Sequence, residues 1–205
     1  MKQSLPIFRI LALCTLMFSA HAMAAGQATD PSSSTRPIDK DRSTLTVRVM
    51  KSGLFSAFAH NHEISAPLTG GTIVTENAGK TGNVSLTVDA RQLTVLDPEA
   101  SASTRADIQK TMHSAKVLDS ENFKEIKFVS TAVKPSSGGR YAVTGDLTLH
   151  GQTHSVQVDV VFSDGHYRGS ATVKQTDFGI TPISIGGGSI KVKDEVKIEF
   201  DIVVR

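Results

Sequence analysis

Cysteine and tryptophan are almost absent from this 205-residue chain, which has one Cys and no Trp. The cysteine, Cys14, lies inside an N-terminal apolar segment. A chain processed beyond that segment therefore has no disulfide, thiolate metal site or cysteine nucleophile. Aromatic residues make up only 5% of the chain. This scarcity disfavours a carbohydrate-stacking surface and suits an aliphatic cavity.

Long apolar runs and an excess of charge are also lacking. After the N-terminal segment, no stretch has the roughly 20 apolar residues of a transmembrane helix, so we expect no transmembrane segment. The formal net charge of +2 comes from Lys2 and Arg9, and their removal would leave equal numbers of acidic and basic side chains. This balance gives no electrostatic reason to expect nucleic acid as a partner.

The first 24 residues have the pattern of a secretory signal peptide. Lys2 and Arg9 form a positive region, residues 10–20 are apolar, and Ala22 and Ala24 frame a small-residue cleavage site. We expect cleavage after Ala24 and a periplasmic or secreted location. Residues 25–41 have hardly any large apolar side chain and are predicted to be a flexible segment. Residues 42–205 are predicted to form one domain.

Most of the domain alternates between apolar and polar residues, the pattern of strands with one buried face. Residues 44–49, 84–89 and 196–204 are clear cases. The sharpest predicted hairpin turns at Gly151-Gln152, read as a type II′ turn that pairs 150 with 153 and 149 with 154. This pairing places the apolar residues of both strands on one face.

The predicted fold class is all-β. Residues 101–118 break the alternation with a helical spacing of Ile108, Met112 and Ala115, which predicts a short helix. We expect an antiparallel, up-and-down, lipocalin-like barrel of about eight strands, with this helix across one end, because closure removes the exposed sheet edges. A barrel of this size is either filled by side chains or holds a small ligand.

Several segments resemble the YceI family of lipocalin-like, polyisoprenoid-binding proteins. Residues 143–151, VTGDLTLHG, are similar to the family hairpin "vtGdLTihG". Residues 127–131, 175–180 and 192–198 are similar to further family segments in the same order. The chain is identified as a divergent member, because Gln175 replaces a family arginine and residues 46–50 depart from the family's first strand. The resemblance implies a periplasmic barrel that holds an isoprenoid or similar lipid, and it extends from about Ile38 to the C-terminus.

A histidine pair is the feature that the resemblance does not explain. On a strand, His60 and His62 would point to one face about 6 to 7 Å apart, which suits two ligands of one metal ion. A third ligand would come from elsewhere, with His154 or His113 as candidates. Alternatively, the histidines line a polar barrel rim and meet a ligand head group. His150 is expected to structure its turn rather than to act as a base.

The expected function is that of an exported binding protein, not an enzyme, because no catalytic motif is recognisable. It would hold an apolar ligand as a carrier or buffer, with a stress-related role as one option and no cofactor. The alternative is a periplasmic metal-binding module that uses His60 and His62. The sequence leaves open whether the protein forms a homodimer. The expected cavity and rim residues are Phe58, His60, His62, Phe128, Leu147, Leu149, His154, Val156 and Phe200, with Leu45, Val47 and Val158 on the same inward face.

Overall fold

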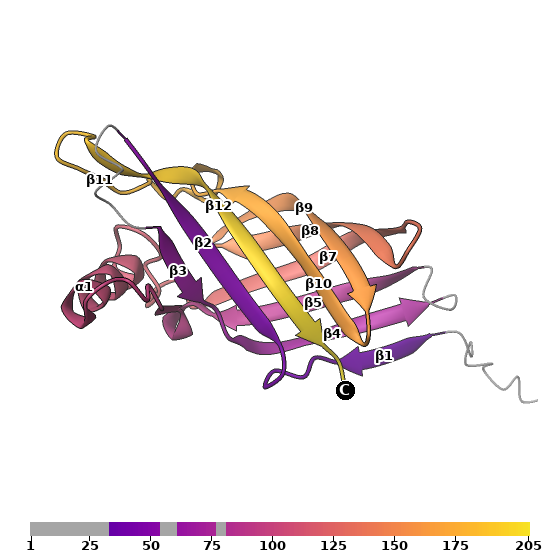
Figure 1. Cartoon of the computed structure of the whole chain (residues 1–205). Coiled ribbons are helices and arrows are strands. Elements are labelled where there is room, and N and C mark those ends of the chain that lie inside the picture. The colour runs from indigo at the N-terminus through magenta and orange to yellow at the C-terminus, as the bar shows by residue number, and fades with distance from the viewer. Residues whose placement is uncertain (1–32, 54–60, 77–80) are drawn as a thin grey trace, which may run out of the picture. The chain divides into compact units, whose positions relative to one another are not determined.

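The described residues form a single antiparallel sheet of twelve strands, seen in a computed structural model (Figure 1). The structure describes residues 33–53, 61–76 and 81–205, which lie within one compact unit. The predicted signal peptide, with its cleavage site at Ala24, lies outside the described residues. The strands are β1 (Ser34–Pro37), β2 (Thr44–Ser52), β3 (His62–Ser65), β4 (Leu68–Glu76), β5 (Thr81–Asp89), β6 (Thr94–Val95), β7 (Glu125–Pro135), β8 (Arg140–Leu149), β9 (Gln152–Ser163), β10 (His166–Lys174), β11 (Ser184–Ile185) and β12 (Ile190–Val203).

Eight of these strands are nine residues or longer and make the wall of the barrel. They follow the order β4-β5-β7-β8-β9-β10-β12-β2, in which most neighbours are also consecutive long strands of the chain. Pairing of β12 with β2 joins the last strand to the first long one. The predicted up-and-down antiparallel barrel is therefore confirmed. Its alternating strands bury one face and leave the other to solvent.

Two short segments connect β2 and β12 with β4. Strand β3 pairs with β2 and is separated from β4 only by Ala66 and Pro67. At the opposite end of the barrel, Ile38 forms a bridge with Val204 and donates its N–H to the carbonyl of Gly71 on β4, at 3.0 Å. The chain itself thus links β3 to β4 at one end of the barrel, and backbone hydrogen bonds of Ile38 link β4 to the segment after β12 at the other.

The predicted boundary of the flexible segment at residue 41 is wrong. Strand β1 pairs with β4 over residues 34–37, and Ile38 is 4% exposed. The prediction rested on the scarcity of large apolar side chains. However, a strand can be held by backbone hydrogen bonds to a neighbour, with a single apolar residue as its anchor.

The predicted register of the β8–β9 hairpin is also wrong. Leu149 pairs with Gln152 and Leu147 with His154, so the turn residues are His150 (φ 50°) and Gly151 (φ 72°). Two positive φ values define a type I′ turn, which matches strand twist, and histidine tolerates this conformation better than most residues. The pairing slips by two positions along β9, so the predicted inward face is unchanged.

The one α-helix of the described residues, α1 (Ala102–His113), lies at one end of the barrel (Figure 1). Ser101 caps it, because its Oγ accepts a hydrogen bond from the N–H of Thr104 at 3.1 Å. The helix ends five residues before the predicted boundary, and buried Met112 faces the core. Two 3-10 helices, η3 (Ala90–Gln92) and η4 (Thr176–Phe178), lie between strands.

Candidate functional site: an apolar cavity inside the barrel

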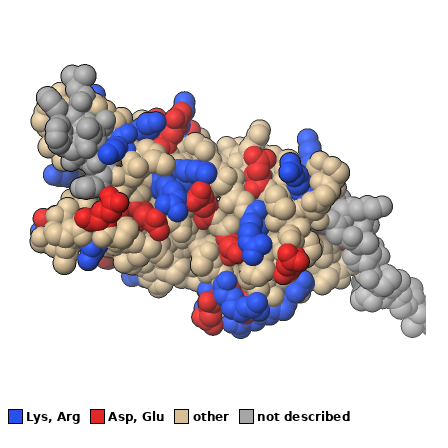
Figure 2. All heavy atoms as spheres, viewed as in Figure 1, with Lys and Arg blue, Asp and Glu red and all other residues tan. Residues whose placement is uncertain are grey.

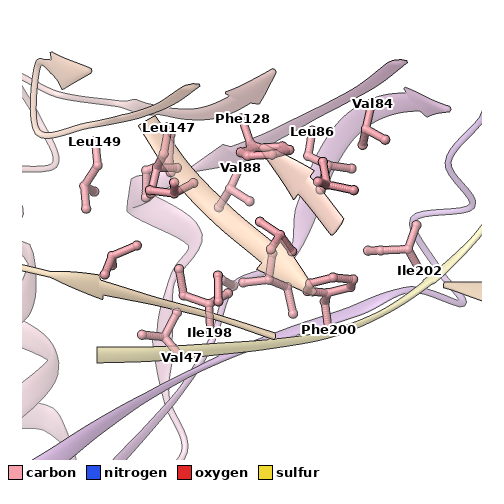
Figure 3. Close-up of a pocket in the computed structure, with 18 of the residues that line it drawn as sticks. Val47, Val84, Leu86, Val88, Phe128, Leu147, Leu149, Ile198, Phe200 and Ile202 are labelled. Atoms are coloured by element: carbon pink, nitrogen blue, oxygen red, sulfur yellow. The ribbon is translucent and has the colours of Figure 1, made fainter. Parts of the chain in front are cut away.

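A cavity of about 260 Å³ lies inside the barrel, so the barrel is hollow rather than filled. Its wall is made by inward side chains of successive strands, which Figure 3 shows pointing toward one another. On β8 it extends from Tyr141 to Leu149, which are eight residue steps apart, or roughly 26 Å along the strand at about 3.3 Å per residue. The cavity is therefore long and narrow. The residues of its wall include Leu45, Val47, Val49, Val84, Leu86, Val88, Phe128, Val143, Leu147, Leu149, Val156, Val158, Val160, Ala171, Val173, Ile198, Phe200 and Ile202.

Two glycines help to keep the cavity open. A Cβ at Gly145 would lie 2.4 Å from Cζ of Phe128, and one at Gly169 would lie 2.7 Å from Cζ of Phe200. Each ring thus occupies the space that a side chain would need on the neighbouring strand. Because both phenylalanines lie against the wall over a glycine, they occupy less of the lumen than rings projecting across it.

The apolar part of the cavity wall agrees with the alternation of apolar and polar residues in the sequence. The cavity is lined by all the inward apolar residues expected from β-strand alternation, namely Leu45, Val47, Phe128, Leu147, Leu149, Val156, Val158 and Phe200. Sequence reasoning missed Tyr141 and Tyr167. The signal was present, because Tyr141 has the same parity on β8 as Leu147.

Two of the expected rim histidines, His62 and His154, lie away from the cavity. Nδ1 of His62 lies 2.6 Å from Oδ2 of Asp97, whose side chain is buried and whose Oδ1 also accepts the N–H of Glu63. His154 is exposed and packs edge-on against Phe178, with ring centroids 5.2 Å apart. Neither histidine lines the cavity. Phe58 and His60 lie outside the described residues.

His113, the remaining candidate for a third metal ligand, and the turn residue His150 both contact other groups of the fold. His113 contacts Gln109, Ser120 and the carbonyl of Leu93. His150 contacts the carbonyl of Phe178 through Nδ1, at 3.1 Å. Over residues 33–53, 61–76 and 81–205, no three His, Cys, Asp or Glu side chains form a group that could hold a metal ion. The described residues thus give the metal-binding alternative no support.

The two ends of the cavity differ in polarity. At the α1 end, the buried side chains of Leu93, Met112, Leu118 and Ile180 line it. Gln175 is also at this end, but its Nε2 donates to the carbonyl of Lys193 at 2.8 Å. At the other end the lining includes Thr75, Asn83, Tyr141 and Tyr167.

The described wall of the cavity has no charged side chain. Within the described chain, no Asp, Glu, Lys, Arg or His lines the cavity. Arg48 on the outer face of β2 contacts Glu63 at 2.7 Å and Glu199 at 2.6 Å, and these hydrogen bonds raise its pKa above the ordinary value. Figure 2 shows acidic and basic residues interspersed on the face in view. This arrangement offers no single-sign surface there for a polyanion.

Comparison with known proteins places the chain in a family. The family model described as YceI-like domain matches residues 37–204. The chain belongs to the YceI family. Among curated relatives, a UPF0312 protein of Pseudomonas savastanoi is 39% identical over an alignment of 88 residues that covers 38% of this chain and 46% of that protein. A UPF0312 protein of Vibrio cholerae is 29% identical over 51% of this chain and 59% of its own length. The chain thus spans about half the length of these relatives.

One solved structure supports the fold of this YceI-family chain. The crystal structure of Burkholderia cenocepacia BcnA has a TM-score of 0.63 at 20% identity, covering 80% of this chain and 98% of that one. A Campylobacter jejuni YceI protein has a TM-score of 0.45 at 11% identity, covering 69% of this chain and 81% of that one. The first similarity supports the barrel and is too distant to identify a ligand. In the described part of the chain, no helix is long and apolar enough to cross a membrane.

Proposed function

We propose that this protein binds a long-chain, apolar, isoprenoid- or lipid-like molecule in its barrel and acts as a carrier or buffer for it. The observation that carries the proposal is the long cavity lined almost entirely by aliphatic and aromatic side chains. An apolar cavity of roughly 150 Å³ in another protein stays dry and binds small apolar molecules. The cavity described here is larger and longer, which suits a chain rather than a compact ring.

The energetics favour a ligand with a long tail. Burial of each methylene group contributes about 0.8 kcal/mol, so about ten of them contribute roughly 8 kcal/mol. That gross contribution corresponds to a dissociation constant near 1 μM before ordering costs are subtracted. A short apolar molecule would gain too little from this wall to bind tightly.

Binding rather than catalysis is proposed because the described wall of the cavity lacks a charged acid or base. General acid–base catalysis requires a titratable group within hydrogen-bond reach of the reacting atoms. Tyr141 and Tyr167 are the lining residues with an ionisable side chain. Burial raises the pKa of Tyr167 above its ordinary value of 10.0, so its phenol stays protonated near neutral pH. It can donate a hydrogen bond but is a poor base.

The test is extraction of the purified protein followed by mass spectrometry, together with uptake of a long-chain fluorescent probe by the stripped protein. Ala171→Phe should reduce uptake at least tenfold, because Ala171 is small and lines the cavity. Thr172→Phe is the matched control, because Thr172 is the next residue on β10 and is exposed. A protein that purifies without lipid and takes up no long-chain probe would contradict the proposal.

We also propose that the protein is exported to the periplasm or secreted. The support is the pattern of charge, apolar residues and small residues over residues 1–24. Mass spectrometry of the protein from the extracytoplasmic fraction should give a mature chain that begins at Ala25. Recovery of the uncleaved chain in the cytoplasm would refute export.

A further inference from the structure

Apart from Gln175, whose amide donates to the carbonyl of Lys193, the polar side chains that line the cavity lie at the end away from α1. Tyr141 and Tyr167 are the two tyrosines of the chain, and both line the cavity on that side. The ring of Tyr167 packs against Phe162 at the β9–β10 hairpin, with centroids 4.6 Å apart. In the described part of the protein, neither phenol hydroxyl has a hydrogen-bond partner. Both hydroxyls can therefore donate to a ligand.

A guanidinium group lies at the same end. In β1, Ser34 pairs with Thr75 and Arg36 with Ile73, and paired residues project from the same face of a sheet. Thr75 and Ile73 line the cavity, so Arg36 shares their inward face. Its side chain is close enough to Tyr167 for the guanidinium to lower the pKa of the phenol, although burial, the larger effect, raises that pKa.

Arg36 has N–H groups that make no hydrogen bond to the described residues. Its Nε donates to the main-chain oxygen of Arg205 at 3.3 Å. Its two terminal nitrogens make no hydrogen bond to any residue that the structure describes. A guanidinium carries five N–H donors in a planar fork that matches the oxygens of a carboxylate or phosphate. The cation is thus placed beside an apolar cavity, with the N–H groups of both terminal nitrogens available to a ligand.

We propose that Arg36, Tyr141 and Tyr167 form the binding site for the anionic head group, a carboxylate or phosphate, of a long-chain amphiphile whose tail extends toward α1. This inference rests on the proposed carrier function and adds the chemistry and direction of the ligand. It differs from the expected rim of His60, His62 and His154: His62 and His154 do not line the cavity, and His60 lies outside the described residues. The tail end is formed by buried apolar residues such as Met112 and Leu118, which would meet a hydrocarbon terminus without unpaired polar groups.

The experiment compares dodecyl phosphate, dodecanoate and dodecanol, three probes with the same tail, by calorimetric titration of the stripped full-length mature protein below micelle concentrations. The two anions should bind at least about tenfold more tightly than dodecanol, a difference of about 1.4 kcal/mol. Arg36→Gln should remove most of that preference and leave dodecanol binding unchanged. Tyr141→Phe and Tyr167→Phe should each weaken anion binding several-fold. A larger loss for the phosphate than for the carboxylate in Arg36→Gln would identify phosphate as the preferred head.

Two control variants make the test specific. Arg168→Gln removes an exposed cation at the same end of β10, one that donates to Asp201 on the outer surface at 2.9 Å. It should leave the anion preference intact. Gln175→Leu removes the polar group at the α1 end and should also have no effect on head-group preference.

The outcomes separate this inference from the carrier function. If all three probes bind equally well, the head-group site is wrong and the carrier function stands. If Gln175→Leu removes the anion preference and Arg36→Gln does not, the ligand lies in the opposite direction and the proposal is overturned. If none of the three probes binds to the stripped protein, the carrier function itself is contradicted.

Discussion

Two glycines occupy equivalent positions in two tight hairpins and provide a matched pair for mutation. In the β8–β9 turn, His150 and Gly151 have φ values of 50° and 72°. In the β9–β10 turn, Asp164 and Gly165 have φ values of 54° and 82°. Alanine at the second position of either turn must adopt a left-handed conformation, which costs roughly 1–2 kcal/mol. The backbone contribution should therefore be the same in Gly151→Ala and Gly165→Ala.

The surroundings of the two glycines differ. A Cβ at Gly165 would meet no atom within 4 Å, whereas one at Gly151 would lie 2.6 Å from Cε1 and 3.0 Å from Cδ1 of Phe123. The Phe123 ring also packs edge-on against His150, with centroids 4.5 Å apart. Moving this ring should cost a further 1–3 kcal/mol or so, as overpacking does elsewhere. We expect a total loss of about 2–5 kcal/mol for Gly151→Ala and about 1–2 kcal/mol for Gly165→Ala.

The assay is urea unfolding of the two variants and the parent, with stability taken from the midpoint at unchanged slope. A double variant, Gly151→Ala with Phe123→Leu, tests the cause. A smaller side chain at position 123 should make the Gly151→Ala change cost about as much as Gly165→Ala. Equal losses for the two single variants would refute the reasoning, because they would mean that Phe123 does not restrict the turn.

Three further predictions concern a glycine in the cavity wall and two hydrogen-bonded carboxylates. Gly145→Ala should destabilise the barrel by about 1–3 kcal/mol in urea unfolding, because its Cβ would lie 2.4 Å from Cζ of Phe128. A hydrogen bond from the Thr176 hydroxyl lowers the pKa of Asp194 below 3.8. The stabilisation that ionised Asp194 contributes should therefore be present above pH 3.8 and lost as the pH falls through its lowered pKa. The difference in urea midpoint between the parent and Asp194→Asn should close on acidification. Asp97→Ala should lower the melting temperature, because it removes the hydrogen bonds to the partly buried Nδ1 of His62 and N–H of Glu63, at about 1 kcal/mol each. An undiminished midpoint difference for Asp194→Asn at low pH would contradict the second prediction. An unchanged melting temperature for Asp97→Ala would contradict the third.

The inward face of the barrel could be predicted because it follows from local alternation. Leu147 and Val156 lie on the cavity wall as expected, although the turn between them was assigned to the wrong residues. A turn shifted by one residue moves the partner of each position by two, and a shift of two preserves the face. The turn type itself was harder to predict, because Gly151 suits the first position of one turn type and the second position of another.

The histidines could not be interpreted from their spacing, because their partners are distant in sequence. His62 contacts Asp97, 35 residues later, and this contact forms only when β3 packs beside the segment after β6. Spacing along a strand predicts which side chains share a face. It does not predict which distant carboxylate or carbonyl will occupy a ring nitrogen.

Whether the barrel would be hollow depended on contacts across strands. The sequence shows Phe128 and Phe200 as inward aromatic residues, and inward aromatics can fill a barrel of eight strands. Gly145 and Gly169 help to leave the barrel hollow, because each lies where the neighbouring phenylalanine ring needs space. A glycine within a strand ordinarily weakens it, so its presence indicates a close approach by another group. The glycine and its aromatic neighbour are informative together only once the strand register is known, and that register is set by the whole sheet rather than by either segment.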